Sequence, residues 1–237
     1  MTSREDIEGV WEAHAQAWCE WARTPGQDVF YSHMNLPAFE TVLPAAGRRT
    51  LDVGCGEGRV GRRLADLGHY VAGIDSSPTL TGPAREAGGY DEVVCGDARE
   101  LPWEADEFDL AVAFMSLHDM SDPASVLDEI ARVLEAGGAL CLMIVHPLNR
   151  PEEHVEDYFS ERRYSVTVEH HGLSMTFEGI DRPLEAYTAG LARAGFVIEE
   201  LCEPHASAEA VAAHPELAPA ARRPYSLVMR CRLTPSR

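Results

Sequence analysis

The sequence predicts an α/β protein built on a mostly parallel β-sheet with helices on both faces. Apolar strand-like runs alternate with amphipathic helical patterns through the middle of the chain. This rhythm is typical of strand–helix–strand units joined by right-handed crossovers. A glycine-rich turn, "TLDVGCGEGRVG" at residues 50–61, directly follows the first apolar run. We therefore expect a ligand to approach bare backbone behind the first strand of the sheet.

Five strands and three helices are expected in the central part of the chain, residues 45–146. The strand-like runs lie at residues 50–54, 70–75, 92–95, 108–114 and 139–145. Helical patterns lie between them at residues 58–67, 77–87 and 123–135. At 237 residues, we expect one domain with additional segments at both sides of this core.

The N-terminal segment, residues 1–44, is expected to be helical. Residues 3–23 repeat apolar and aromatic side chains at spacings of three and four, which predicts an amphipathic helix. "TPGQD" ends that helix, and a second short helix is expected at residues 36–43. We expect this segment to close over a site as a lid.

The chain after residue 146 changes character twice. Residues 147–181 contain "YSVTVEHHGLSMTF", whose alternation on both sides of "HHG" predicts a β-hairpin with His170 and His171 in a solvent-exposed turn. Residues 182–237 begin with a helix that ends at Gly195. A strand at "VIEEL", an Ala/Pro-rich stretch with a short helix and a last strand at "YSLVMRCRL" follow it.

Composition restricts the possible partners. Asp and Glu number 39 against 20 Lys and Arg, and the formal net charge of −19 disfavours binding to nucleic acid or to an anionic membrane. No apolar run approaches the roughly 20 residues of a membrane span, and the N-terminus lacks the apolar region of a secretory signal. We therefore expect a cytoplasmic protein with a small-molecule substrate. The six scattered cysteines include no CxxC pair, so neither a disulfide framework nor a metal site is expected.

The glycine turn alone leaves its ligand open. Gly54, Gly56 and Gly58 free the backbone N–H groups for close contact with a ligand. Residues 56–61, "GEGRVG", also satisfy the dinucleotide pattern G-x-G-x-x-G. A tight turn without a ligand and a nicotinamide-dependent oxidoreductase are both compatible with the turn.

Three carboxylates point to a different ligand. Asp52 lies inside the first strand, where a buried carboxylate needs a partner or a cation such as a ligand ammonium group. Asp75 ends the second strand, where a carboxylate can accept hydrogen bonds from a ribose diol. Asp97 follows the third strand, within reach of an adenine amine. S-adenosylmethionine has all three groups and no phosphate.

With these residues the chain resembles the class I S-adenosylmethionine-dependent methyltransferases over residues 49–147. The motifs that carry the resemblance are "LDVGCGEGR", "VAGIDSSP", "CGDARELPWEADEFDLAVAFMSLHDM" and "EIARVLEAGGALCLMIVHPL". The resemblance implies a Rossmann-like sheet of seven strands, mostly parallel, that ends in an antiparallel strand. The segment "YSLVMRCRL" would form this last strand. It also implies an N-terminal helical lid, beside the hairpin-containing insertion after strand five.

The resemblance also implies which residues bind the cofactor. It places the methionine moiety at Gly54, Cys55 and Gly56, near Asp52. The ribose is expected at Asp75 and Ser76. The adenine is expected at Gly96, Asp97 and Ala98, with Phe114 and Met115 beneath the cofactor.

His118, Asp119 and His146 are the candidate catalytic residues. They follow strands four and five, and ligands in open α/β sheets bind beyond the carboxyl ends of the strands. An imidazole at this place could accept a proton if the acceptor must lose one. Alternatively, His118 packs beside the adenine or caps a helix, His146 bonds a loop carbonyl, and Asp119 caps the next helix.

The aromatic side chains of the lid and of the insertion are candidates for the acceptor pocket. We expect Trp11, His14, Trp18 and Tyr31 on one side, with His33 nearby. Tyr158, Tyr164, Met175 and Phe177 would form the opposite wall. The alternative is a stripe of core residues that seats the first helix on the sheet.

The sequence thus predicts methyl transfer from S-adenosylmethionine to a small molecule. An aromatic acceptor or a natural-product intermediate suits the aromatic cap, and the chain is similar to methyltransferases of bacterial secondary metabolism. Two alternatives remain: a nicotinamide-dependent oxidoreductase and a non-catalytic partner subunit that only binds the cofactor. The methylated atom and the oligomeric state are not indicated.

Overall fold

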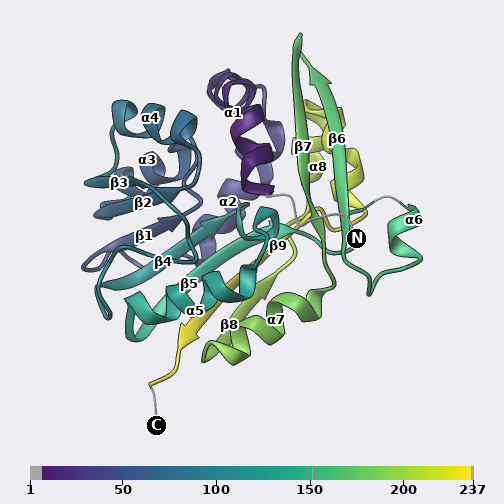
Figure 1. Ribbon diagram of the computed structural model, residues 1–237. Coiled ribbons are helices and arrows are strands. Elements are labelled where there is room, and N and C mark those ends of the chain that lie inside the picture. The colour runs from purple at the N-terminus through teal and green to yellow at the C-terminus, as the bar shows by residue number, and fades with distance from the viewer. Residues whose placement is uncertain (1–6, 151, 236–237) are drawn as a thin grey trace.

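A seven-stranded sheet forms the centre of the computed structural model, which describes residues 7–150 and 152–235 (Figure 1). The strand order is β3-β2-β1-β4-β5-β9-β8, and β9 runs antiparallel to both of its neighbours. The strands are β1 Thr50–Val53, β2 Val71–Asp75, β3 Glu92–Cys95, β4 Phe108–Phe114, β5 Leu134–Val145, β8 Phe196–Cys202 and β9 Ser226–Leu233. The predicted Rossmann-like sheet with an antiparallel last strand is confirmed.

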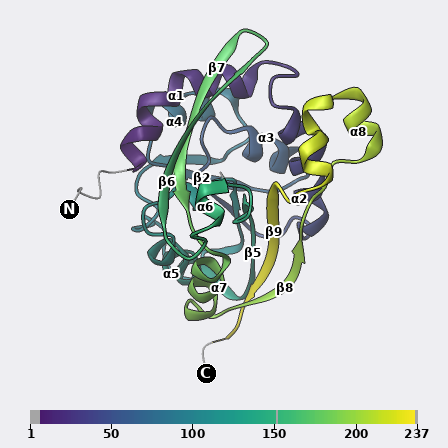
Figure 2. The same cartoon turned by 90° about the vertical axis from the view of Figure 1, so that its right-hand side faces the viewer.

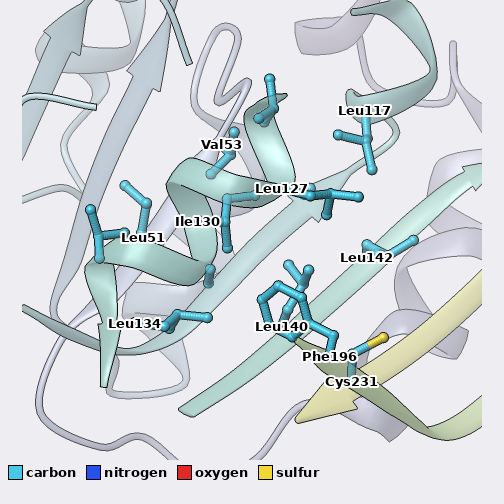
Figure 3. Close-up of a cluster of buried hydrophobic side chains, with 14 of the residues drawn as sticks. Leu51, Val53, Leu117, Leu127, Ile130, Leu134, Leu140, Leu142, Phe196 and Cys231 are labelled. Carbon is cyan, nitrogen blue, oxygen red and sulfur yellow. The ribbon is translucent and has the colours of Figure 1, made fainter. Parts of the chain in front are cut away.

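Helices cover both faces of the sheet because buried side chains alternate along its strands. On one face, the leucines of β1 and β5, together with Phe108 of β4, pack under α5 (Pro123–Val133) and α7 (Leu184–Arg193) (Figure 3). The opposite face packs against α2 (Leu36–Val42) and α3 (Arg59–Asp66). α4, Pro78–Ala87, follows β2 and begins with the capping side chain of Ser77, which accepts a hydrogen bond from Leu80 N.

One boundary differs from the prediction. β5 begins at Leu134 rather than at residue 139, and α5 therefore ends at Val133. Leu134 still pairs with Phe108 of β4, and the register then shifts before Leu110 pairs with Ala139. Gly137 at φ +84° lies within this shift, so the "EAGG" stretch forms an irregular extended segment instead of a helix end.

The remaining elements gather above one edge of the sheet. α1, Ile7–Arg23, forms most of the predicted first helix, and residues 3–6 of that prediction lie outside the described residues. Figures 1 and 2 show the hairpin of β6 (Arg162–His170) and β7 (Leu173–Asp181) projecting beyond the sheet beside α1. Phe177 of β7 contacts Trp18 and Trp21 of α1 edge to face. The N-terminal helix and the insertion therefore form one cap.

Short elements complete the chain. They are the π-helical turn Tyr31–Asn35, the 3₁₀ turns η2 (Leu117–Asp119) and η3 (Pro215–Ala221), α6 (Glu152–Val155) and α8 (Ala208–Ala213). In the described part of the chain, no helix has both the length and the apolar character needed to cross a membrane.

The hairpin turn corrects one expectation. His171 is exposed, but His170 is half-buried: its Nδ1–H donates to Gln27 O at 3.0 Å, and its ring lies near Trp21. The hairpin tip is therefore attached to the N-terminal segment rather than free in solvent.

Candidate active site

A cavity of about 560 Å³ lies between the sheet and the cap. Its floor is the glycine turn after β1 and the segments that follow β2, β3 and β4. Its walls come from α1, the segment around Phe30 and the inner face of the hairpin. All elements expected at the cofactor and acceptor sites thus meet in one space.

The glycine turn meets the cavity with bare backbone. Gly54 and Gly56 have φ of +72° and +56°, and a Cβ at Gly54 would lie 2.5 Å from the Ser116 Cβ. At Gly56 the nearest atom to an added Cβ is Trp18 Nε1 at 3.6 Å, across the space that the turn leaves open. Only glycine adopts the positive φ at these two positions and also lets a ligand come close to the backbone.

Asp75 fixes the same turn from the end of β2. Its two carboxylate oxygens accept from Gly56 N at 2.8 Å and from Ser77 N at 2.9 Å. Burial raises the pKa of Asp75, and the two backbone bonds oppose that rise. The carboxylate therefore borders the cavity, beside Ser76, in a fixed orientation.

The other predicted cofactor residues also border the cavity. They are Cys55, Gly96, Asp97, Ala98, Phe114 and Met115. Hydrogen bonds from Arg99 hold the pKa of Asp97 below its usual value. Met115 has φ of +53°, so the chain turns sharply directly after β4.

Asp52 has a different partner from the one expected. Its carboxylate is buried below the turn and does not border the cavity; Oδ2 accepts from Tyr90 Oη at 2.7 Å. Burial raises the pKa of Asp52 to about 7. The structure therefore gives Asp52 a tyrosine partner in place of the expected contact with a ligand ammonium group.

Tyr90 also explains two glycines. Gly61 N donates to Tyr90 Oη at 3.1 Å, and a Cβ at Gly61 would overlap the Tyr90 ring. A Cβ at Gly73 would lie 2.7 Å from the same ring. The last glycine of "GEGRVG" thus makes room for a tyrosine of this chain, which the sequence reasoning missed. A buried carboxylate in β1 was the signal that such a partner was needed.

His118 and Asp119 form a buried pair on η2 at the cavity. His118 Nε2 lies 3.4 Å from Asp119 Oδ1. His118 Nδ1 and Asp119 Oδ1 have no hydrogen-bond partner among the described residues. Burial, with a smaller effect from Arg182, lowers the pKa of His118 to about 3, and burial raises the pKa of Asp119. His118 is therefore a neutral imidazole near neutral pH.

Arg182 holds this pair in place and was not foreseen. Its buried guanidinium donates to the carbonyl oxygens of His118, Met120 and Ser121 at 3.2, 2.8 and 3.2 Å. Arg182 follows β7 directly, so the turn that carries His118 is attached to the hairpin of the cap.

His146 lies apart from the cavity. Its Nδ1 accepts from Leu148 N at 3.1 Å, and its Nε2 lies 2.9 Å from Glu203 Oε1. Both ring nitrogens are thus engaged in holding the loop after β5, and the residue does not border the cavity. The geometry does not favour His146 as a base, and His118 remains the candidate.

Comparisons with known proteins agree with this site. Residues 51–142 match a protein-family model described as a methyltransferase domain. An S-adenosylmethionine-dependent methyltransferase from Mesorhizobium loti has a similar structure, with a TM-score of 0.67 and 26% identity; the match covers 83% of this chain and 96% of that chain. The core of this chain is a class I S-adenosylmethionine-dependent methyltransferase domain. The expected family and its cofactor are confirmed.

Two curated relatives match the same core of this chain. An uncharacterized methyltransferase of Mycobacterium tuberculosis is 36% identical over 106 residues, which cover 45% of this chain and 43% of that protein. The 27-O-demethylrifamycin SV methyltransferase of Amycolatopsis mediterranei is 40% identical over 104 residues, covering 41% of this chain and 38% of that protein. The match thus spans less than half the length of these two relatives.

The part of the cavity between α1 and the hairpin contains some of the residues predicted to bind the acceptor. Trp11 and Trp18 of α1 border it, facing Tyr164 and Phe177 of the hairpin. Trp11 and Trp18 contact edge to face, with ring centroids 6.0 Å apart. These rings form an aromatic wall above the glycine turn.

Four residues that were predicted to bind the substrate lie outside the cavity. His14 Nε2 lies 3.8 Å from Glu178 Oε1, and Tyr31 packs against Phe114. The hydroxyl of Tyr158 accepts from Leu184 N, and Met175 is buried. None of these four borders the cavity, and neither does His33, which stacks on His214. Their aromatic or apolar character reflects packing of the cap.

Several other residues that border or flank the cavity were not predicted. Phe30 and Tyr225 stack with centroids 4.3 Å apart, which brings the N-terminal segment and the residue directly before β9 together at the cavity. Arg59 pairs with Asp28 at 2.7 Å and lies over the Tyr31 ring. No local pattern indicates these contacts, because they join segments far apart in the chain.

Proposed function

We propose that this protein transfers a methyl group from S-adenosylmethionine to a small-molecule acceptor with an aromatic or natural-product skeleton. The observation that carries the proposal is the single cavity, in which the glycine turn and Asp75 face the same space as His118 and the aromatic wall. The donor and the acceptor could therefore lie side by side.

The residues at the floor fit the cofactor. Gly54 and Gly56 leave room for the methionine moiety, Asp75 would hold the ribose, and Asp97 would hold the adenine. When bound, S-adenosylmethionine supplies a methyl group activated by its sulfonium. The carboxylates of Asp75 and Asp97, together with the exposed backbone of the glycine turn, suit a ligand with hydroxyl groups and a positive charge better than they suit a pyrophosphate.

The chain's own residues would contribute orientation and a proton acceptor. Trp11, Trp18 and Phe177 would exclude water and align the acceptor, an effect worth up to about 7–11 kcal/mol in favourable cases. Burial keeps His118 neutral over the whole physiological range, which leaves its Nδ1 free. Because burial also makes the imidazole a weak base, it would accept the hydroxyl proton only as the acceptor oxygen gains positive charge from the incoming methyl group.

A small acceptor agrees with the charge and with one relative. The net charge of −19 disfavours nucleic acid as a substrate. The relative from Amycolatopsis mediterranei is named for a rifamycin, and it shares the core with this chain. We therefore favour an aromatic natural-product intermediate as the acceptor.

The test compares the methyl transfer catalysed by the unchanged protein with that catalysed by a variant that lacks the His118 imidazole. Purified protein is incubated with radiolabelled S-adenosylmethionine and a library of phenolic acceptors, and products are detected by mass spectrometry. His118→Ala should lower kcat by about 10²–10⁴-fold and leave the affinity for S-adenosylhomocysteine unchanged. His205→Ala, which removes an exposed imidazole, is the control. Absence of any methylated product would contradict the proposal, and full activity of His118→Ala would remove the base from it.

A further inference from the structure

Arg150 is a buried cation in the cavity wall with an unusual set of partners. The residue is 7% exposed and borders the cavity. Its guanidinium donates to two carbonyl oxygens, Arg182 O at 2.7 Å and Tyr158 O at 3.3 Å. Its Nε has no hydrogen-bond partner among the described residues. These carbonyl oxygens accept hydrogen bonds from two of the five N–H groups of the guanidinium, but they carry no negative charge to compensate it.

The other two arginines of the cavity differ in this respect. Arg59 pairs with Asp28 at 2.7 Å, and Arg99 pairs with Asp97 at 2.6 Å. Among the side chains that the structure describes, no carboxylate lies within ion-pair distance of Arg150. This is notable in a chain with 39 acidic residues against 20 basic ones.

The nearby charges do not compensate Arg150. Arg182, which is joined to it by a hydrogen bond, is a second buried cation, and its carboxylate partner Glu161 lies 3.4 Å away on an exposed side chain. Asp181 is within 2.7 Å of His154. Asp119 is buried, which favours its neutral form. None of these carboxylates therefore serves as a counter-charge to Arg150 at ion-pair distance.

We propose that Arg150 binds a carboxylate of the methyl acceptor, so that the substrate is a small organic acid. The inference rests on the proposed methyl transfer and specifies its acceptor. A buried cation without a counter-charge is costly, and a ligand carboxylate would remove that cost. The guanidinium keeps three N–H groups beyond its two carbonyl bonds, and paired N–H groups suit the two oxygens of a carboxylate.

The surroundings of Arg150 define the rest of this acid. Tyr164, Phe177 and Val166 of the hairpin border the same cavity, opposite the glycine turn. Val166 is 44% exposed because its side chain faces this open space. An aromatic or largely apolar skeleton would bury these side chains while its carboxylate reaches Arg150. The acceptor class is thus an aromatic acid that also carries the group to be methylated.

Matched acids and amides test this inference by binding alone. The probes are 4-hydroxybenzoate, 4-hydroxycinnamate and 3-hydroxy-2-naphthoate with their three amides, titrated calorimetrically into protein saturated with S-adenosylhomocysteine. We expect at least one acid to bind about 10-fold or more tightly than its amide, because a charge-assisted pair replaces a neutral contact. Arg150→Gln should abolish that preference, and Arg150→Lys should keep part of it.

Arg162→Gln is the matched control, because Arg162 is a hairpin arginine whose partner Asp157 is exposed. The control should keep the preference of the unchanged protein for the acid. The inference is overturned if no acid in the set binds more tightly than its amide, or if folded Arg150→Gln retains the preference. If Arg150→Gln does not fold, Arg150→Lys carries the test: it must lose part of the acid preference because it lacks the paired N–H groups, and an unchanged preference in Arg150→Lys overturns the inference. Binding of S-adenosylhomocysteine itself reports separately on the proposed function.

Discussion

Tyr90 and Asp52 show how a single buried pair supports the glycine turn. Asp52 lies in β1 directly before the glycine turn, and Tyr90 bonds both its carboxylate and the backbone of α3 at Gly61. The tyrosine thus joins the strand and the helix on either side of the turn. Because its ring fills the space left by Gly61 and Gly73, this support leaves no room for larger side chains.

Asp52 predicts a specific pH dependence of stability. Its pKa is about 7 in the folded protein and about 3.8 in the unfolded chain, so the folded state binds more protons between these values. The free energy of unfolding should therefore fall as pH rises from about 4 to 7, by up to about 4 kcal/mol from this group. Asp52→Asn should flatten that part of the profile in urea unfolding measured at several pH values. The exposed Asp66→Asn is the control, and an unchanged slope in Asp52→Asn would contradict this explanation.

At the scale of elements, α1 closes the cavity through one carboxylate. Glu12 of α1 accepts from Thr79 Oγ1 at 2.6 Å and from the hydroxyl of Ser77, at the start of α4. The hydrogen bond from Ser77, which is the largest effect, lowers the pKa of Glu12. Ser77 also donates its backbone N–H to Asp75, so the lid and the expected ribose site share one residue.

Removal of this carboxylate should loosen the lid. Glu12→Ala should weaken binding of S-adenosylhomocysteine by about 5-fold or more and speed proteolysis within α1, because the hydrogen bonds to α4 are lost. Calorimetry measures the first effect, and timed digestion with chymotrypsin, which cleaves after the tryptophans of this helix, measures the second. Glu20→Ala, an exposed position of the same helix, should change neither. If the two variants behave alike, Glu12 does not hold the lid closed.

The sequence predicts elements better than the direction of their side chains. The glycines, Asp75 and Asp97 were located because parallel strands end at one edge of the sheet, which fixes the backbone positions. His146 also ends such a strand, but its ring turns to Leu148 and Glu203. The same limit applies to the hairpin, where Met175 is buried beside the cap while Phe177 borders the cavity. Contacts between distant segments decide these directions.

Over the whole molecule, the cap and the sheet are joined at the cavity. α1 and the hairpin pack together, Arg182 connects the hairpin to η2, and Gln27 holds the hairpin tip through the carbonyl of His170. A ligand that contacts both the floor and the cap would therefore stabilise two separate segments of the chain.

Hydrogen exchange tests this coupling. Binding of S-adenosylhomocysteine should slow exchange in α1 and in the β6–β7 hairpin, as well as at the glycine turn, because local opening of the cap exposes the ligand. β8, at the far edge of the sheet, should show little change apart from global stabilisation. Protection limited to the glycine turn would mean that the cap does not close over the cofactor.

The most direct measurement is a calorimetric titration of ligand-free protein with S-adenosylhomocysteine and, separately, with NAD. We expect binding of S-adenosylhomocysteine at one site and no binding of NAD. Asp75→Ala should weaken the first by about 10-fold or more, whereas Asp91→Ala at an exposed position should not. No affinity for S-adenosylhomocysteine, or equal affinity for NAD, would contradict the assignment of this cavity to a sulfonium nucleoside.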